Sequence, residues 1–413
     1  MKTSIKEIKV GLNFGSEIQS VGRLAIRNGI IYFEYDEAFL HNSLEISPIK
    51  LPLQRGVIEL PKDPFEGLAG VFNDSLPDGW GRLLFDRMLR SEGISLSDIS
   101  PLDRLAYVGL NGMGALVYEP DQSPDSSNEI LDLDALAVQT EEVLEGESGE
   151  VINQLLALNG SSAGARPKAL IGLDASRKNI TYGAKELSDD FEHWIVKFPN
   201  TRDGNDAGAI EYVYALMASK AGIEMPDVHL FPSHKGSGYF AIKRFDRNGN
   251  KRSHMHTVSG MVHSNFRFPS HDYEDVLSLT GILTKDIREV EKMFRLAVFN
   301  VMAHNRDDHA KNFSFLMNEF GEWKLSPAYD LTFASGPGGE QSTMVLGEGK
   351  NITREYLLKL GLEAKLSKVF VENVIEQTQT ALSDWTNLSK DFGVSKASIE
   401  IIQKALVKFR INH

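Results

Sequence analysis

Five polar side chains follow one another in a fixed order along the chain, and they are carried by four predicted elements. Lys197 lies at the end of an apolar strand, and Glu211 lies near the start of the amphipathic helix that follows. Asp307 and Asn312 share one polar loop, and Asp330 comes directly after a predicted hairpin. A single residue of this kind arises easily by chance, but the ordered series does not. The series therefore predicts a fold that presents these side chains together.

The loop that carries Asp307 and Asn312 has the spacing Asp-x-x-x-x-Asn, which is that of the protein-kinase catalytic loop. Phosphoryl transfer uses a carboxylate to receive the proton of the acceptor hydroxyl, and oxygen ligands to hold Mg²⁺ on the phosphates. This chemistry assigns the base to Asp307 and the metal ligands to Asn312 and Asp330. Lys197 would hold the nucleotide phosphates, oriented by an ion pair with Glu211. The triplet that begins at Asp330 is Asp-Leu-Thr, whereas protein kinases have Asp-Phe-Gly.

Each of these signals also has an ordinary structural interpretation. Loops rich in Asp, Asn and His are usually turns or helix caps. A lone lysine on an apolar strand usually extends to solvent from a sheet edge, and a glutamate on an amphipathic helix usually faces water. The loop could also hold a hydrolytic metal ion through the cluster His304, Asp307, Asp308 and His309. The order of the elements favours the kinase-type interpretation.

A run of small residues at 160–168 is the candidate phosphate loop. Small side chains let backbone N–H groups approach phosphate oxygens, and Arg166 and Lys168 add positive charge. The run matches neither G-x-x-x-x-G-K-[ST] nor G-x-G-x-x-G, so an ordinary flexible turn is the simpler interpretation. A second polar, glycine-rich run at 73–81 is typical of a helix N-cap followed by a packed Trp80.

The chain has 413 residues, which exceeds the roughly 250–300 residues at which a single core stops growing, so two or more lobes are expected. It has no cysteine, which excludes disulfides, thiolate nucleophiles and Cys-ligated metals. The N-terminus lacks the apolar core of a signal peptide, and no stretch approaches the roughly 18 apolar residues of a membrane span. A cytoplasmic protein without a membrane anchor is the prediction.

The formal net charge of −13 comes mainly from one segment. Residues 119–150 contain 11 acidic residues and no Lys or Arg, and the rest of the chain is close to neutral. A solvated acidic linker or helix face is expected there, and an acidic mimic of nucleic acid is the alternative. The chain has no basic stripe, so it is not expected to bind nucleic acid by itself.

The pattern of elements predicts an α+β protein with a two-lobed, protein-kinase-like fold. Two strand-like runs flank Asn28-Gly29, which is a hairpin signal. We expect a β-rich N-terminal lobe with an additional N-terminal subdomain and an all-helical C-terminal lobe. The predicted boundaries are residues 1–120 for the N-terminal subdomain, 121–150 for an acidic linker, 151–246 for the nucleotide-binding part of the N-lobe and 247–413 for the helical catalytic C-lobe.

Several strings of the chain resemble the HipA family of bacterial serine/threonine kinase toxins. The string Asp-x-His-Ala-Lys-Asn over residues 307–312 is specific to that family. The resemblance covers most of the chain, through residues 72–81, 160–168, 194–199, 243–247, 307–312 and 325–330. It implies a kinase-like fold that uses ATP and Mg²⁺ to phosphorylate a protein hydroxyl, with a HipA-type N-terminal subdomain at residues 1–120.

The resemblance assigns roles residue by residue. Asp307 would be the catalytic base, Asn312 and Asp330 the metal ligands and Lys197 the phosphate-binding lysine, with Glu211 as its structural ion-pair partner. The further nucleotide-binding residues would be Ala163, Gly164, Ala165, Lys243, Phe245, His309 and Lys311. Ser161, or the adjacent Ser162, would be autophosphorylated in the glycine-rich loop, and this modification would silence the enzyme.

The resemblance also implies partners. Family members phosphorylate aminoacyl-tRNA synthetases, which stalls translation and is associated with persistence, and a small helix-turn-helix antitoxin neutralises them. DNA would be reached only through that antitoxin, in a type II toxin–antitoxin system. Two alternatives stay open, a small-molecule kinase of similar fold and a non-catalytic co-repressor that acts with a DNA-binding antitoxin. The loop departs from the best-known members at Arg166-Pro167, where they carry Gln-Glu.

Overall fold

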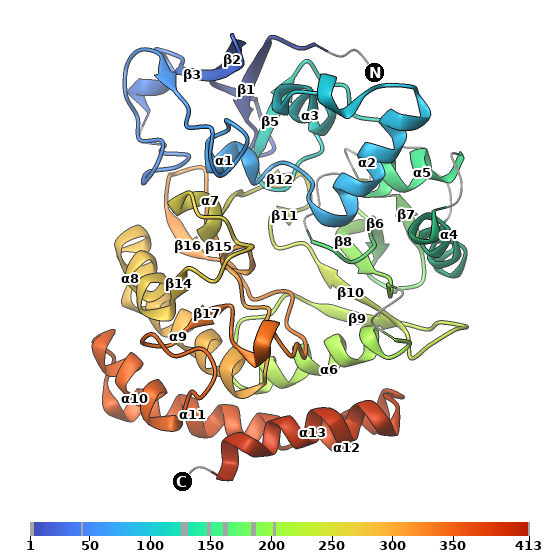
Figure 1. The fold of residues 1–413 in the computed structure, drawn as a ribbon, viewed down its shortest axis with the longest axis vertical. Helices are drawn as coiled ribbons and strands as arrows, with labels where there is room; N and C mark the ends of the chain where they lie inside the picture. The colour runs from blue at the N-terminus through green and yellow to red at the C-terminus, as the bar shows by residue number, and fades with distance from the viewer. Residues whose placement is uncertain are drawn as a thin grey trace. The chain divides into compact units, whose positions relative to one another are not determined.

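A computed structural model of the chain describes residues 4–42, 44–124, 131–146, 150–159, 164–182, 187–200 and 204–411. Its helices and strands, labelled in Figure 1, form two compact units. Unit 1 comprises Met1–Arg202, Ala241–His263 and Leu316–Glu322, and unit 2 comprises Asp203–Phe240, Ser264–Phe315 and Trp323–His413. Both units bury apolar side chains in a core.

Unit 1 begins with a five-stranded antiparallel sheet in the order β4-β3-β2-β1-β5. Its strands are β1 (Glu7–Leu12), β2 (Gln19–Arg27), β3 (Ile30–Tyr35), β4 (Ile58–Glu59) and β5 (Leu116–Glu119). Burial alternates along β3, so Ile31, Phe33 and Tyr35 point into the core. The predicted hairpin is confirmed, because β2 and β3 pair across Asn28 and Gly29, whose φ values of 53° and 78° suit a type I′ turn.

Short helices pack around this sheet. They are α1 (Gly70–Asn73), α2 (Gly79–Ser91), α3 (Pro101–Val108) and, later in the chain, α7 (Val258–Val262). α3 begins with a capping box in which the Ser100 and Asp103 side chains bond each other's backbone N–H groups, and Pro101 occupies the first helical position. α3 packs against β1 and β5, and α1 packs against α7.

A second sheet in unit 1 carries the elements of the predicted nucleotide-binding part. β6 (Lys168–Asp174) pairs antiparallel with β7 (Ile180–Tyr182) on one side and with β8 (Phe191–Lys197) on the other. β6 is buried along nearly its whole length, as its place between two strands requires. The last residues of β10 (Tyr239–Lys243) also belong to unit 1, followed by β11 (Arg247–Asn248), β12 (Lys251–Arg252) and β13 (His254–Thr257).

The acidic segment contains helix α4 (Leu133–Glu145) and ends at the start of α5 (Glu150–Asn159). Leu133, Leu136 and Val143 of α4 are buried, whereas Glu141 and Glu145 are exposed. α4 packs against α5, which in turn contacts α2 and β6. This part of the segment is therefore a packed helix with an acidic outer face, one of the two structures expected for it.

Asp74, directly after α1, links this helix to β13 and α7. Its carboxylate accepts hydrogen bonds from the backbone N–H and the hydroxyl of Thr257, each at 2.8 Å, and lies 2.7 Å from Nδ1 of His256. Nε2 of His256 lies 3.0 Å from the hydroxyl oxygen of Ser47. Ser47 is 1% exposed and His256 is 0% exposed, so this Ser–His–Asp chain is a structural link that no substrate reaches.

A buried charge cluster lies where β10 leads into β11. Asp246 is fully buried and accepts hydrogen bonds from Arg244, Arg247 and the backbone N–H of Gly114. Burial acts to raise the pKa of Asp246, but the two guanidinium groups outweigh it and hold the pKa below its usual range. Arg247 and Arg252 also donate to the Gly114 carbonyl, so the loop that precedes β5 is fixed to this cluster.

Unit 2 is built from longer helices, which Figure 1 colours from green to red. They are α6 (Ala207–Lys220), α8 (Tyr273–Thr284), α9 (Ile287–Met302), α10 (Arg354–Glu363), α11 (Lys368–Leu382), α12 (Trp385–Asp391) and α13 (Lys396–Ile411). α9 packs against α8 and α11, and α6 packs against α11 and α12. The buried Tyr214 of α6 donates its hydroxyl to the carbonyl of Ala303 at 2.7 Å and packs edge-on against Trp385. These contacts fix the end of α9.

The predicted fold class is confirmed, but the all-helical description of the C-terminal lobe needs correction. Within the predicted lobe, residues 247–413, unit 2 contains β14 (His271–Asp272), β16 (Trp323–Leu325) and β17 (Thr343–Met344), and β15 (Ser314–Met317) begins in it. The unit also contains β9 (Val228–Phe231), which lies before that boundary. β14 pairs in parallel with β17. Such short pairs satisfy the backbone groups of loops that run through the interior. β14 and β17 have two residues each and carry no periodicity that a sequence could reveal, whereas β15 and β16 form the hairpin expected before Asp330.

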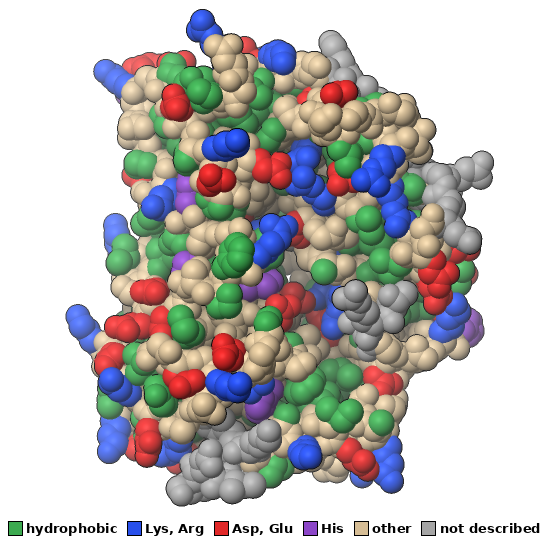
Figure 2. All heavy atoms as spheres, viewed as in Figure 1, with side chains coloured by type: hydrophobic (Ala, Val, Ile, Leu, Met, Phe, Trp, Pro, Cys, Tyr) green, Lys and Arg blue, Asp and Glu red, His purple; other side chains and the backbone are tan. Residues whose placement is uncertain are grey.

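Two further expectations concern the surface. Among the described residues, no helix is both long and apolar enough to cross a membrane. On the face drawn in Figure 2, basic and acidic side chains are interspersed. That face therefore lacks the field of a single sign that steers proteins to nucleic acid.

Asp246→Asn should destabilise unit 1 strongly. The substitution leaves Arg244 and Arg247 buried without their counter-charge, and breaking a buried ion pair in this way costs on the order of 3 kcal/mol. We expect the midpoint of thermal unfolding, measured by differential scanning fluorimetry, to fall by several degrees. The matched control is Asp384→Asn, which removes an exposed ion pair with Lys220 and should cost less than about 1 kcal/mol. Equal shifts in the two variants would contradict a stabilising role for the cluster.

Candidate active site

The predicted catalytic loop begins where α9 ends. Its first residues include His304, whose φ of +53° lies in the left-handed region and turns the chain away from the helix. A short 3-10 helix, η3 (Ala310–Asn312), ends the loop. Nδ2 of Asn312 donates to the backbone carbonyl of Asp307 at 2.7 Å. Asp307 and Asn312, which the sequence spacing predicts to act together, therefore lie on one turn of the structure.

The two adjacent aspartates of this loop have opposite environments. The side chain of Asp307 is 65% exposed, whereas Asp308 is fully buried. A reacting hydroxyl from another molecule can approach only the exposed carboxylate. The geometry therefore makes Asp307, not Asp308, the candidate base.

The Asp308 carboxylate accepts four hydrogen bonds. The Tyr273 hydroxyl and Nε2 of Gln341 donate to Oδ2, at 2.5 and 3.1 Å. The backbone N–H groups of Ser342 and Thr343 donate to Oδ1, at 2.9 and 3.2 Å. Burial raises the pKa of the Asp308 carboxyl to about 7, against these hydrogen bonds, which favour the charged form.

Phe266 packs over two loop residues that the family resemblance assigns to nucleotide binding. Its ring centroid lies 5.0 Å from that of His309 and 4.8 Å from Nζ of Lys311. Nε2 of His309 lies 4.0 Å from Oδ1 of Asp307, and its Nδ1 is buried without a hydrogen-bond partner among the described residues. A buried imidazole nitrogen in this state suits a polar group of a ligand.

Asp330 follows the predicted hairpin, which is confirmed by hydrogen bonds from Ser326 to Ser314 and from Asn318 to Glu322. The φ of Asp330 is +57°, a left-handed conformation that aspartate tolerates better than most residues. The hydroxyl of the preceding Tyr329 donates to the carbonyl of Lys311 at 2.7 Å. The backbone next to Asp330 is thereby tied to the catalytic loop.

These residues suit a magnesium ion. Mg²⁺ prefers oxygen ligands such as carboxylates and amide carbonyls. The bond from Nδ2 of Asn312 to the Asp307 carbonyl fixes the amide, so that Oδ1 is the atom it can offer a cation, and Asp330 supplies a half-buried carboxylate. The hydrolase-type cluster considered above is not formed. Asp308 is buried, and no group of three or more His, Cys, Asp or Glu side chains in the described part of the chain could hold a metal ion.

In unit 1, Lys197 lies directly opposite Lys168 across the β6–β8 pair. Cross-strand partners project from the same face of a sheet, and like charges placed there destabilise each other. Lys168 is 7% exposed and Lys197 is half-buried, so water screens the pair only in part. Two ammonium groups on one sheet face favour a polyanion such as a triphosphate.

The start of α2 holds the end of the candidate phosphate loop. The N–H of Gly164 donates to the carboxylate of Asp78, and its carbonyl accepts from the N–H of Trp80 at 3.0 Å. Gly79, between them, has φ of +44°, and a Cβ there would lie 2.5 Å from the Gly164 carbonyl oxygen. Asp78 makes no side-chain cap bond to α2. The run 73–81 therefore anchors the loop. It also contains the expected start of a helix, with Asp78 at the N-cap position of α2 and Trp80 buried, although the Asp78 side chain does not cap the helix.

The other predicted site residues of the candidate phosphate loop lie before and after Gly164. Ser161, Ser162 and Ala163 lie outside the described residues. Ala165 is exposed beside Gly164. After it, the carbonyl of Pro167 accepts from the N–H of Phe198 at 2.9 Å, which joins the end of the loop to the residue after Lys197.

The remaining candidates are embedded in their own units. Nζ of Lys243 lies 2.6 Å from Oε1 of Glu192, so its ammonium group already has a counter-charge in unit 1. Phe245 is half-buried beside the Asp246 cluster. Glu211 is 2% exposed on α6 of unit 2, which excludes a water-facing side chain. Its ion pair with Lys197 of unit 1 stays a prediction.

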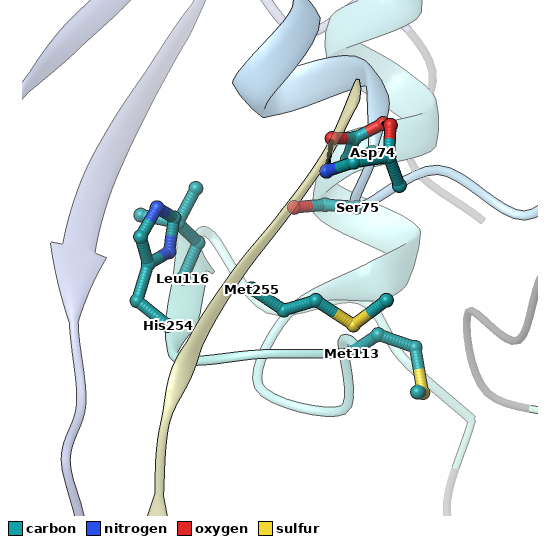
Figure 3. Close-up of a pocket in the computed structure, with 7 residues that line it drawn as sticks. Asp74, Ser75, Met113, Leu116, His254 and Met255 are labelled. Atoms are coloured by element: carbon teal, nitrogen blue, oxygen red, sulfur yellow. Dashed lines mark hydrogen bonds between the residues drawn. The ribbon is translucent and has the colours of Figure 1, made fainter. Parts of the chain in front are cut away.

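The pocket drawn in Figure 3 holds none of the predicted site residues. It lies in unit 1, with Met113 and Met255 close together and the polar groups of Asp74 and His254 at its wall. Its place beside the Asp74 link makes it a gap in the packing of α1, β5 and β13.

Sequence reasoning placed Asp78 in a helix cap and Asp308 in an alternative metal cluster, and so missed the structural roles of both residues. Both make their bonds to residues far along the chain, 86 positions away for Gly164 and 34 for Ser342. The one local signal was the Asp307-Asp308 doublet, because two adjacent carboxylates in an ordered loop rarely share one environment.

The sheet with two facing lysines and the loop with one exposed aspartate define a protein of the kinase-like class. The chain belongs to the HipA family. The family model of the HipA-like C-terminal domain matches residues 160–385, and that of the HipA N-terminal domain matches residues 16–119. The family resemblance inferred from the sequence is thereby confirmed.

One solved structure and two relatives are similar to this chain over nearly its whole length. The HipA protein of the Shewanella oneidensis MR-1 toxin–antitoxin system, solved with HipB and its operator DNA, shares the fold with a TM-score of 0.68 and 15% identity, covering 97% of this chain and 95% of that one. Two Sinorhizobium fredii proteins carry the names "Putative kinase Y4mE" and "Putative kinase Y4dM". They are 24% and 23% identical, covering 90% and 91% of this chain and 91% and 90% of their own.

Gly79→Ala should loosen the loop that α2 holds. The added Cβ would collide with the Gly164 carbonyl, so the two hydrogen bonds to Gly164 should open more often. We expect amide hydrogen exchange in a peptide covering residues 164–168 to become severalfold faster, measured by mass spectrometry. Gly93→Ala is the matched control, because Gly93 has φ of +73° with no atom within 4 Å. It adds the same backbone strain without the collision and should leave this peptide unchanged. Equal exchange in the Gly79 variant and the parent protein would refute the anchor.

Proposed function

We propose that this protein is an ATP- and Mg²⁺-dependent serine/threonine protein kinase and the toxin of a type II toxin–antitoxin system. The observation that carries the proposal is the loop 307–312, in which an exposed carboxylate and a fixed amide share one turn. Membership of the HipA family and the names of the two Sinorhizobium relatives support it.

The reaction asks mainly for positioning and charge. The acceptor hydroxyl oxygen forms a bond to the γ-phosphorus, its proton passes to the Asp307 carboxylate, and the bond to the bridging oxygen breaks to release ADP. Asn312 and Asp330 would hold Mg²⁺, which neutralises charge on the phosphates. Lys197, supported by the facing Lys168 and paired with Glu211, would bind the phosphate oxygens.

The other nucleotide contacts follow from the same proposal. They would come from Ala163, Gly164, Ala165, Lys243, Phe245, His309 and Lys311. Lys243 would exchange its ion pair with Glu192 for a nucleotide group, and the buried Nδ1 of His309 would gain a partner. We also propose the four-part division at residues 120, 150 and 246, with the catalytic part after residue 246.

Partners are proposed by analogy. The Shewanella HipA structure contains HipB and operator DNA, which supports an antitoxin partner here and contact with DNA through that partner. The substrate would be a protein such as an aminoacyl-tRNA synthetase, in the cytoplasm. Mixed charges on the face in Figure 2 agree with an indirect contact with DNA.

Asp307→Asn should abolish phosphate transfer. The amide cannot accept the hydroxyl proton, so the intact mass of the variant should stay constant on incubation with Mg²⁺ and ATP, while the parent chain gains a phosphate group. Asp391→Asn, at an exposed carboxylate that ends α12, is the control and should behave like the parent. Equal gains in the Asp307 variant and the parent would refute its role. A parent chain that binds ATP without transfer would favour a small-molecule kinase, and one that does not bind ATP would favour the co-repressor.

Phosphorylation of the glycine-rich loop should weaken ATP binding. A phosphoserine adds about −1.5 to −2 charges beside the proposed triphosphate site, and repulsion between the two groups should lower affinity. Calorimetric titration of ATP into phosphorylated and phosphatase-treated protein would measure the difference, and Ser161→Ala and Ser162→Ala would identify the acceptor. Equal ATP affinities of the phosphorylated and the phosphatase-treated protein would contradict silencing by autophosphorylation.

A further inference from the structure

Asp308 is a fully buried carboxylate directly beside the proposed base, and it joins three segments of unit 2. Tyr273 begins α8, Gln341 to Thr343 lead into β17, and Asp308 itself belongs to the catalytic loop. Burying a carboxylate costs free energy unless both of its oxygens accept hydrogen bonds, and both oxygens of Asp308 do so. The site is therefore built around a carboxylate at this position.

The two oxygens of Asp308 have different partners, and all of the partners are donors. Oδ1 receives two backbone N–H groups, and Oδ2 receives a phenol and an amide N–H. Tyr273 cannot turn its hydroxyl hydrogen elsewhere without loss, because its oxygen already accepts from Nδ2 of Asn300 at 3.0 Å. An asparagine in place of Asp308 would set an NH₂ group against these donors.

The same neighbours also bracket Asp307 through its backbone. The N–H and the hydroxyl of Ser342 donate to the carbonyl of Arg306, at 3.2 and 2.9 Å. The hydroxyl of Thr343 donates to the carbonyl of Asp308. The peptide group before Asp307 and the one after Asp308 are thus fixed by the segment that Asp308 holds, while the Asp307 side chain stays exposed.

We propose that Asp308 is a positioning residue for the phosphoryl transfer proposed above: by holding residues 341–343 against the catalytic loop, it fixes the backbone from which Asp307 reaches the acceptor hydroxyl. This inference rests on the proposed function. Misplacement of a reacting group by about 1 Å lowers a rate by roughly a hundredfold. Weakening the hydrogen bonds between residues 341–343 and the catalytic loop should therefore slow phosphate transfer without weakening the binding of ATP.

The test compares Asp308→Asn with Asp206→Asn. Asp206 also accepts several hydrogen bonds in unit 2, but those from Ser395 and Ser398 tie α6 to the start of α13, and the one from Ser237 ties it to the loop before β10. The rate of phosphate incorporation at saturating Mg²⁺-ATP and the ATP concentration for half-maximal rate are measured for both variants. We expect Asp308→Asn to lower the rate about ten- to a hundredfold, with the half-maximal ATP concentration within about twofold of the parent. Asp206→Asn should change neither, even if its melting temperature falls.

A second variant covers the case in which Asp308→Asn does not fold. Tyr273→Phe keeps the carboxylate and removes one donor, so the rate should fall severalfold at an unchanged half-maximal ATP concentration. An unchanged rate in a folded Asp308→Asn, or in Tyr273→Phe, would overturn the positioning role while leaving the kinase proposal intact. Equal rate losses in the Asp308 and Asp206 variants would overturn it as well, because general destabilisation would explain both. Absence of incorporation by the parent chain would instead contradict the kinase proposal.

Discussion

The carboxylate of Asp74 is the contact on which the arrangement of unit 1 depends. It satisfies Thr257 and His256, which lie more than 180 positions away, and so joins α1 to β13 and α7. The helices approach so closely that a Cβ on Gly70 would lie 2.0 Å from the Gly260 carbonyl oxygen. The residues that follow extend the same link, because Ser75 accepts from the Tyr118 hydroxyl and Asp78 holds Gly164. One short run thus joins the first sheet, β13 and the glycine-rich loop.

In unit 2, the buried side chains that hold the loop 307–312 are different from the exposed side chain to which we assign the chemistry. The interior carries a polar chain from Asn305 through Asn300 and Tyr273 to Asp308, in which each side chain bonds the next. Hydrogen-bonded chains of this kind are rigid where each group is satisfied. That is the case from Asn300 to Asp308, whereas Oδ1 of Asn305 has no partner among the described residues. The exposed Asp307 has the opposite requirement, because the base proposed at this position must stay accessible to its substrate. Asp307 and Asp308 are adjacent in one loop, yet one must be exposed to solvent and the other must be buried and fully hydrogen-bonded.

Local signals in the sequence predicted much of this architecture. Asn28-Gly29 specifies its hairpin through the backbone freedom of two residues, and the spacing of Asp307 and Asn312 specifies a single turn. The order of the lysine strand, the polar loop and the hairpin predicted the fold class. Asp78 and Asp308 could not be found in this way, because their partners are distant in sequence and only the folded chain brings them together. The pairing of β14 with β17 could not be predicted for the same reason, because the two strands lie about 70 positions apart in the sequence.

The hold of Asp78 on Gly164 bears on how this loop can meet a nucleotide. A backbone N–H has one hydrogen to donate, and at Gly164 a carboxylate already accepts it. Loops of this kind bind phosphates through the same N–H groups. A phosphate oxygen at this position would compete with the Asp78 carboxylate for the same hydrogen. Gly164 is therefore bonded to an anionic group of the protein itself, and the free energy of nucleotide binding proposed for this loop would include the cost of weakening that bond.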